Sequence, residues 1–184
     1  HYLNRNSKTG SKKNISFHYD LGNSFYEKWL DKSMTYSSGM FKKSSDDLYD
    51  AQLNKYRNLA KITDIKNKDK VLEIGCGWGG FSCFLAKNFS ADVTAITISK
   101  KQYEKVKEKV YKEKLTEKVN VKLTDYREIK GLYDKIVSIE MFEAVGEKYW
   151  SKYFDVLGSN LKNNGSIGLK TITIAVSYTH LRAH

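Results

Sequence analysis

Apolar residues recur along this chain in two rhythms, one typical of buried strands and the other of amphipathic helices. The strand rhythm occupies residues 70–74, 92–97, 119–123, 134–139 and 165–173. Helical spacing fills the intervals at 79–88, 99–114 and 147–161. This alternation predicts an α/β fold, in which a mostly parallel sheet carries helices on both faces.

The N-terminal part of the chain follows another pattern. Residues 1–14 are polar and basic, which predicts a basic arm. Helical spacing over 23–30 and 48–62 predicts a helical N-terminal part across residues 15–66, with Ser44, Ser45 and Asp46 as candidate caps of the second helix. The α/β core is expected over residues 67–174. Residues 175–184 continue no earlier pattern, and we expect them to be a non-native tail.

Composition narrows the class of protein. The 184 residues suit one domain, and the formal net charge of +11 favours partners with anionic surfaces, such as phospholipid headgroups or nucleic acid. No apolar run approaches the roughly 20 residues that span a bilayer, and the first residues lack a signal peptide's apolar core, so we expect a cytoplasmic protein. Cys76 and Cys83 have neither metal-site spacing nor a disulfide framework, so no metal site is expected.

A glycine-dense turn carries the main chemical signal. Residues 71–80 read VLEIGCGWGG, a strand and a tight turn that lead into a helix, as in nucleotide pockets. Gly75, Gly77 and Gly80 also satisfy the dinucleotide pattern G-x-G-x-x-G. That pattern expects an acid about 20 residues on, at the end of the second strand. The strand here ends at Thr97 without one, which disfavours a dinucleotide.

An acid lies inside the turn motif instead. Glu73 in Glu-Ile-Gly-Cys-Gly makes the motif resemble motif I of S-adenosylmethionine-dependent methyltransferases. A sulfonium cofactor carries positive charge and an ammonium group, so a carboxylate suits its pocket better than a pyrophosphate's. A phosphate-binding or purely structural glycine turn is the alternative.

Five ordered segments give a narrower resemblance. Residues 18–41, 71–80, 97–102, 125–128 and 141–150 closely resemble the family of cyclopropane fatty acid synthases and mycolic acid cyclopropane synthases. The resemblance implies a Rossmann-like class I methyltransferase fold that uses S-adenosylmethionine. The cofactor-binding residues it implies are Tyr36, Ser37, Leu72, Glu73, Ile74, Gly75, Cys76, Gly77, Trp78, Gly79, Gly80, Thr97, Ile98, Ser99, Gln102, Asp125, Tyr126 and Arg127. Among these, the glutamine of T-x-S-x-x-Q takes the ribose role of the missing acid.

The resemblance also implies the reaction and its catalytic residues. A methyl or methylene group would pass to the cis double bond of an unsaturated fatty acyl chain of a phospholipid, giving a cyclopropane fatty acid. In typical members a bound bicarbonate is the base, held partly by a Cys, a Glu and a His. The matching positions here are Ser38, Glu143 and Lys170, so the Cys and His are replaced. These departures leave a methyl-branched lipid or another small-molecule acceptor as the alternative.

The resemblance further implies where the protein acts. Unsaturated phospholipids place it at the inner face of the membrane, where Lys8, Lys12 and Lys13 could contact anionic headgroups or form an unattached soluble tail. No RNA-binding module is recognisable, so nucleic acid is not expected as a partner. Family members continue beyond the fifth strand, so we expect this chain to be C-terminally truncated, with the last strands missing. Such a fragment could be inactive, or a non-catalytic binding fragment.

Overall fold

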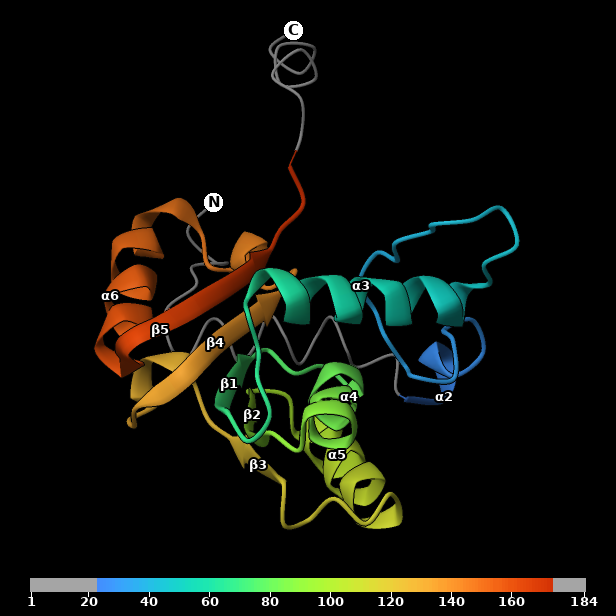
Figure 1. Ribbon diagram of the computed structural model, residues 1–184, viewed down its shortest axis with the longest axis horizontal. Helices are drawn as coiled ribbons and strands as arrows, with labels where there is room; N and C mark the ends of the chain where they lie inside the picture. Colours follow the sequence, from blue (N-terminus) through green and yellow to red (C-terminus); the bar gives the residue numbers. More distant parts are fainter. Residues whose placement is uncertain (1–22, 174–184) are drawn as a thin grey trace, which may run out of the picture.

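The fold is described here from a computed structural model, over residues 23–173 (Figure 1). The predictions made for the basic arm, for Lys8, Lys12 and Lys13, and for the tail at 175–184 lie outside the described residues. Within residues 23–173, no helix combines the length and the apolar character that crossing a bilayer requires.

The centre of the molecule is a five-stranded sheet in which each pair of neighbouring strands is parallel. The strand order is β3-β2-β1-β4-β5. Their bounds are β1 Lys70–Ile74, β2 Asp92–Thr97, β3 Val119–Leu123, β4 Tyr133–Ile139 and β5 Leu161–Lys170. The predicted bounds of the first three strands are confirmed. The order reverses between β1 and β4, and such a switch point opens a crevice at the carboxyl ends of the strands.

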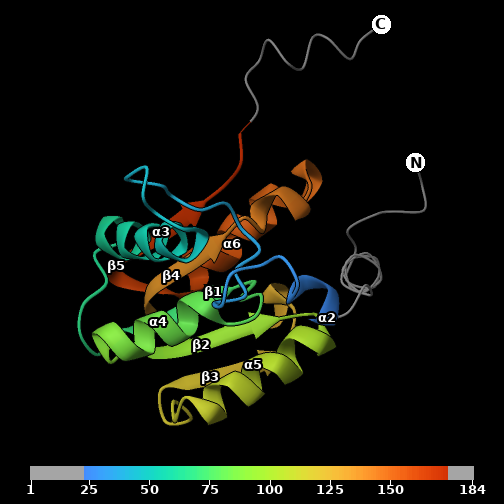
Figure 2. The ribbon, with the colours of Figure 1, turned by 90° about the vertical axis from the view of Figure 1, so that its right-hand side faces the viewer.

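Helices cover both faces of this sheet, as predicted. Figure 1 shows α6 on one side of the strands and α3, α4 and α5 on the other. The helices are α2 Asn23–Tyr26, α3 Leu48–Ile62, α4 Gly80–Phe89, α5 Lys100–Lys112 and α6 Trp150–Asn160, with the single turns η1 Tyr126–Glu128, η2 Phe142–Ala144 and η3 Glu147–Tyr149. Figure 2 shows α4 and α5 running beside β2 and β3.

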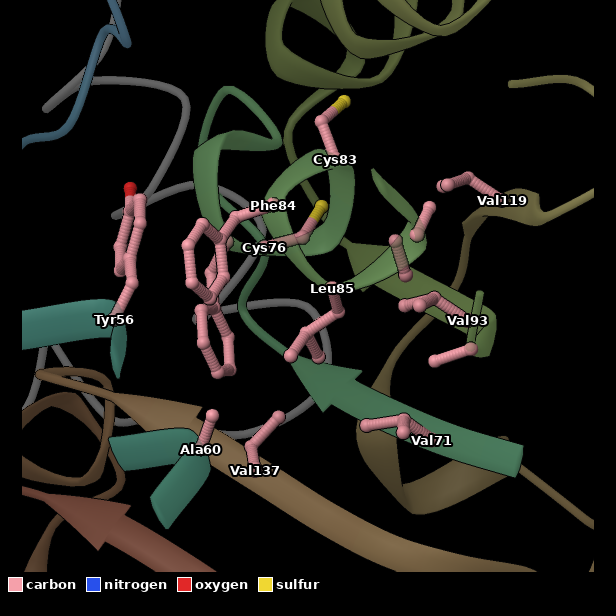
Figure 3. Close-up of a cluster of buried hydrophobic side chains, with 14 of the residues drawn as sticks. Tyr56, Ala60, Val71, Cys76, Cys83, Phe84, Leu85, Val93, Val119 and Val137 are labelled. Carbon is pink, nitrogen blue, oxygen red and sulfur yellow. The ribbon is translucent and has the colours of Figure 1, made fainter. Parts of the chain in front are cut away.

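Strand periodicity divides the core between the two faces. Val71 and Val137 point to the face covered by α3 and α4, and join a cluster with aromatic side chains from both helices (Figure 3). Leu72 and Ile136, one residue away in their strands, pack on the opposite face with Tyr153 of α6. Successive side chains of a strand alternate between faces, so continuous apolar strands require helices on both.

Three predicted elements differ from the structure by three residues or more at one or both ends. The helix predicted over 23–30 ends at Tyr26, and the carboxylate of Asp31 then accepts hydrogen bonds from the backbone N–H groups of Ser33 and Thr35. The strand predicted over 165–173 starts at Leu161, directly after α6, and ends at Lys170. Helix α6 itself begins at Trp150 rather than at residue 147, because residues 147–149 form the turn η3.

The cap of α3 also differs from the prediction. Its N-cap is Asp47, whose side chain accepts from the N–H of Asp50, and the Asp50 carboxylate accepts from the N–H of Asp47. Asp46 instead closes the preceding loop by accepting from the N–H of Lys42, 2.8 Å away. A reciprocal capping box of this kind fixes where a helix begins.

Candidate functional site

A cavity of about 700 Å³ opens at the carboxyl ends of β1, β2 and β4. Most of the predicted site residues line it: Tyr36, Ser37, Glu73, Ile74, Gly75, Cys76, Gly77, Trp78, Gly80, Thr97, Ile98, Gln102, Asp125, Tyr126, Arg127 and Glu143. Five do not: Leu72, which packs in the core, Gly79, Ser99, Ser38 and Lys170. The volume is in the range of small-molecule sites.

The glycine turn forms one wall of the cavity. Gly75, Gly77 and Gly79 have φ values of 78°, 54° and 77°, which L side chains rarely adopt. The N–H groups of Gly75 and Cys76 both donate to the carbonyl of Ile96, each over 3.0 Å, and thereby tie the turn to β2. A Cβ at Gly77 would meet nothing within 4 Å, so the turn presents bare backbone to open space.

Glu73 lies at the base of this wall. Its carboxylate is buried and accepts a hydrogen bond from the hydroxyl of Ser82 in the first turn of α4. Burial, which penalises the charged form, raises its pKa to about 7. A cationic group in the cavity would favour the ionised form of this carboxyl group.

The end of β2 is preorganised by three buried polar side chains. The hydroxyl of Thr97 donates to Oε1 of Gln102 over 2.8 Å, and accepts from the N–H of Ser99 over 3.1 Å. The Ser99 hydroxyl caps α5 by accepting from the N–H of Gln102. Ser99 therefore acts through the loop and helix it shapes, while Thr97 and Gln102 border the cavity.

Asp125 and Arg127 form a rigid pair after β3. Arg127 donates to Asp125 through Nε, over 2.8 Å, and through Nη2, over 2.6 Å. The Asp125 carboxylate, almost fully buried, also accepts from the N–H of Arg127 and caps η1. The ring of Tyr126 packs edge-on against Tyr153 of α6, with centroids 5.2 Å apart.

The N-terminal part closes the cavity from the side of α2 and α3. Gln52 of α3 donates to the carbonyl of Ser37 over 2.8 Å, and Lys55 donates to the Ser37 hydroxyl. The rings of Tyr36 and Trp78 both pack on Tyr26 of α2, with centroids 5.4 Å and 4.8 Å away. Residues 34–37 are therefore held against the glycine turn by two helices.

Two of the three predicted catalytic residues contact a carboxylate that the motif comparison did not single out. Ser38 donates to Oε1 of Glu140 through its hydroxyl over 2.6 Å, and Lys170 donates to the same oxygen. Lys170 also donates to the Ser38 hydroxyl, over 2.6 Å. Glu143 lies apart from this cluster and accepts a hydrogen bond from the N–H of Ile172. Ser38 and Lys170 thus reach the cavity wall through Glu140.

The comparisons with known proteins agree with this geometry. The family model described as mycolic acid cyclopropane synthetase matches residues 6–184. The chain belongs to this family.

Relatives in the family modify lipids, by the names they carry. The chain is 40% identical over 155 residues to the cyclopropane-fatty-acyl-phospholipid synthase of Escherichia coli, covering 84% of this chain and 39% of that protein. It is 34% identical over 175 residues to a tuberculostearic acid methyltransferase of Mycobacterium tuberculosis, covering 91% and 41%. The chain therefore spans about two fifths of the length of these relatives.

A solved structure of a mycolic acid cyclopropane synthase, complexed with SAH and CTAB, has the same fold. Its TM-score is 0.87 at 28% identity, over 94% of this chain and 61% of that one. The fold is thus the Rossmann-like class I methyltransferase fold, as expected.

Sequence reasoning missed several residues of the cavity. Its wall also contains Met34, Thr35, Tyr56, Phe81, Ile96, Thr124, Ile139, Glu140, Met141, Ala144, Val145 and Ile172. Glu140 left a usable signal, since it is an acid placed directly after the buried strand β4. Tyr56 left none, because a tyrosine on the apolar stripe of a helix looks the same whether it faces a core or a cavity.

Proposed function

We propose that the protein uses S-adenosylmethionine to transfer a methyl or methylene group to the cis double bond of an unsaturated fatty acyl chain of a phospholipid, giving a cyclopropane fatty acid. The observation that carries this proposal is the cavity, which joins the glycine turn, the end of β2 and the Asp125–Arg127 pair in one space. The family and the names of the relatives support it.

The charges around the cavity favour a cationic ligand. Among the described residues that line it, the acids are Glu73, Asp125, Glu140 and Glu143. Asp125 is paired with Arg127 and Glu140 with Lys170, so the remaining acidic groups are those of Glu73 and Glu143. A pyrophosphate would meet repulsion in such a wall, while an ammonium and a sulfonium would be attracted. The open space against Gly77 leaves room for a ligand at the backbone. The residues present therefore fit S-adenosylmethionine.

We infer the roles of individual residues from these positions. Glu73 and the glycine turn would hold the methionine end, Gln102 the ribose, and Asp125 to Arg127 the adenine. When bound, S-adenosylmethionine supplies an electrophilic methyl group. An isolated alkene is a weak nucleophile, so the protein must hold the double bond close to that group and exclude water.

Part of the cavity lining suits an acyl chain. Ile139, Met141, Val145 and Ile172 contribute apolar side chains to it, and the lining also includes Glu140 and Glu143. An apolar wall interrupted by carboxylates matches a reaction in which an alkane-like chain passes through a cationic state. We further propose that the protein meets its phospholipid at the inner face of the cytoplasmic membrane.

Transfer to lipid tests the proposed reaction. The full chain, with any sequence that continues it in its gene, is incubated with methyl-labelled S-adenosylmethionine and vesicles of unsaturated phosphatidylethanolamine and phosphatidylglycerol. We expect label in the acyl chains, and a mass increase of one CH₂ unit with loss of the double bond. Vesicles of saturated phospholipid are the matched control. Absence of label in both vesicles would refute the proposal.

Calorimetry with S-adenosylhomocysteine tests the cofactor site separately. Gln102→Ala removes the side chain at the end of β2, and we expect it to weaken binding about tenfold, the cost of one or two hydrogen bonds. Lys107→Ala, on the exposed face of the same helix, is the matched control and should bind like the wild type. Equal affinities of all three proteins would remove Gln102 from the site.

The alternative product is a methyl-branched lipid. Both outcomes begin with the same methyl transfer and differ in where the resulting cation loses a proton. The replacement of Cys by Ser38 and of His by Lys170 keeps this alternative open, and the tuberculostearic acid methyltransferase is a relative with a different named product. The ring and the unreduced branch have the same mass, so NMR spectroscopy of the labelled acyl chains, which resolves cyclopropane from vinylic protons, separates a ring from a branch.

A further inference from the structure

Glu140 is a firmly held carboxylate in the part of the cavity wall that we assign to the acyl chain. It directly follows β4, lines the cavity, and its side chain is only 11% exposed. Four contacts converge on it: the N–H and hydroxyl of Ser38, the ammonium of Lys170, and the backbone bond from its own N–H to the carbonyl of Lys170, over 2.7 Å. Few surface glutamates are immobilised in this way.

The backbone at Glu140 adds an independent sign of function. Its φ is +50°, in the left-handed region that residues other than glycine, asparagine and aspartate seldom adopt. Such strain persists only where surrounding contacts enforce it, and it is concentrated at functional sites. Here it sets the carboxylate at the cavity wall, between Ser38 and Lys170.

These contacts engage the two donors that the resemblance assigned to a bound bicarbonate. The resemblance assigned Ser38, Glu143 and Lys170 to such an ion. Ser38 and Lys170, which could donate to it, are instead bonded to Glu140 and to each other. Glu143, an acceptor when ionised, would repel an anion unless one of the two were protonated. The cluster of Ser38 and Lys170 thus fits the carboxylate of Glu140 better than an added bicarbonate.

The geometry points to Glu140 as the base that takes a proton from the alkylated acyl chain, in the place where a bicarbonate was expected. This inference rests on the proposed function. Methyl transfer forms one carbon–carbon bond from the alkene π electrons and breaks the bond between the methyl group and the sulfur of S-adenosylmethionine, whose electron pair stays on sulfur. It leaves a cation on the neighbouring chain carbon. Glu140 then removes a proton from the added methyl group, and the freed C–H electron pair forms the second carbon–carbon bond, which closes the ring. After the product is released, the proton leaves Glu140 for solvent.

The charge state of Glu140 agrees with this role. Burial raises its pKa, but the hydrogen bonds from Lys170 and Ser38 outweigh burial, so that the pKa lies below its ordinary value. The carboxyl group is therefore ionised at neutral pH. A weak base is sufficient, because the methyl C–H bond is strongly acidic when its electron pair is drawn to the cationic carbon as the ring closes. Lys170 keeps the pair neutral before the reaction, and its charge favours the return of Glu140 to the carboxylate form when the proton leaves for solvent.

Glu140→Gln in the full-length protein tests the inference. We expect turnover on unsaturated phospholipid vesicles to fall about 100-fold or more, the usual contribution of a general base. Affinity for S-adenosylhomocysteine, measured by calorimetry, should stay unchanged. Glu147→Gln, an exposed glutamate on η3, is the matched control and should keep wild-type turnover. Turnover of Glu140→Gln close to the wild type would overturn the inference.

A second variant guards against a loss of folding. Glycine adopts a φ of +50° freely, so Glu140→Gly should fold at least as well as the wild type in thermal denaturation, yet lose turnover to the same extent. If added bicarbonate restores turnover in Glu140→Gly without affecting the wild type, this result would support the inference that Glu140 takes the place of bicarbonate as the base. Wild-type turnover that stops in bicarbonate-depleted buffer would overturn it.

These outcomes are distinct from failure of the proposed function. If the wild type itself transfers no label to unsaturated lipid, the proposed function fails. If the wild type is active without bicarbonate and Glu140→Gln is inactive, the proposed function and the role of Glu140 are both supported. If the wild type is active but the variant is equally active, only the role of Glu140 falls.

Discussion

At the scale of single residues, two buried ionisable groups govern how the site responds to pH. Burial raises the pKa of Glu73 to about 7. Burial, with a smaller contribution from the charge of Lys170, lowers the pKa of Lys55 to about 7. Lys55 donates a hydrogen bond to the Ser37 hydroxyl, and Glu73 lines the cavity next to the glycine turn. The charges of both groups therefore belong to the candidate site.

The pH dependence of stability follows from Glu73. Between pH 4.5, its ordinary pKa, and about 7, the folded protein keeps a proton that the unfolded chain has released. The stability contribution is therefore full below pH 4.5, and is lost as the pH rises through about 7. We expect the unfolding free energy of the wild type to fall by about 1 to 3 kcal/mol over this pH range. Glu73→Gln, which has no titrating group at this position, should not show this loss.

Urea denaturation of both proteins at pH 5 and pH 7.5 measures this difference. Lys55 does not mask it, because its lowered pKa makes stability rise with pH only between about 7 and its ordinary value of 10.5. Parallel pH curves for the wild type and Glu73→Gln would show that Glu73 is not desolvated.

Sequence reasoning reached Glu73 but not Glu140, although both follow apolar strand residues. Glu73 lies in a motif with fixed spacing to three glycines, so its neighbours in the chain identify it. Glu140 acquires its partners from residues 102 and 30 positions away. No local pattern records such contacts.

At the scale of elements, α3 connects its own cap to the candidate site. Its first turn is fixed by the Asp47–Asp50 capping box, and the next turns carry Gln52 and Lys55, which hold Ser37. The predicted bounds of this helix, 48–62, are confirmed, because a long amphipathic stripe identifies a helix well. The predicted caps, Ser44, Ser45 and Asp46, lie one to three residues before the observed cap, Asp47, because all four residues are good N-cap types.

Asp47→Ala tests the cap. It removes the acceptor for the N–H of Asp50, so we expect the unfolding free energy to fall by about 1 kcal/mol. Asp47→Asn keeps an acceptor of similar quality, and should retain most of the stability. Chemical denaturation measures both variants. A loss as large in Asp47→Asn as in Asp47→Ala would indicate that charge, rather than the hydrogen bond, stabilises this helix.

At the scale of the whole molecule, the packing of α3 across β5 joins the N-terminal part to the last described strand. The Ser166 hydroxyl donates to the carbonyl of Thr63 over 2.5 Å. Gly168 lies under the same helix end, where a Cβ would come within 2.0 Å of the Thr63 hydroxyl oxygen and 3.1 Å of Leu59. This close approach fixes how α3 sits over the strand that ends in Lys170.

Gly168→Ala therefore probes the overall arrangement. The added methyl group must push α3 away from the sheet, so we expect a loss of about 1 to 3 kcal/mol in unfolding free energy. Gly158→Ala is the matched control, because a Cβ there meets nothing within 4 Å and alanine favours a helix by about 0.5 to 1 kcal/mol. In thermal denaturation, we expect a lower midpoint for Gly168→Ala and a higher midpoint for Gly158→Ala than for the wild type. A stable Gly168→Ala would mean that α3 moves at little cost.

The sequence by itself determined the alternation of strands and helices, the parallel sheet, the glycine turn and the family. These features depend on interactions between near neighbours: hydrophobic periodicity sets the elements, and the φ values that only glycine tolerates easily set the turn. Tertiary structure alone decided that Ser38 and Lys170, 132 residues apart, meet on Glu140. It decided this because β4 and β5 are neighbours in the sheet and their ends contact a loop from the N-terminal part, and no local pattern specifies that meeting.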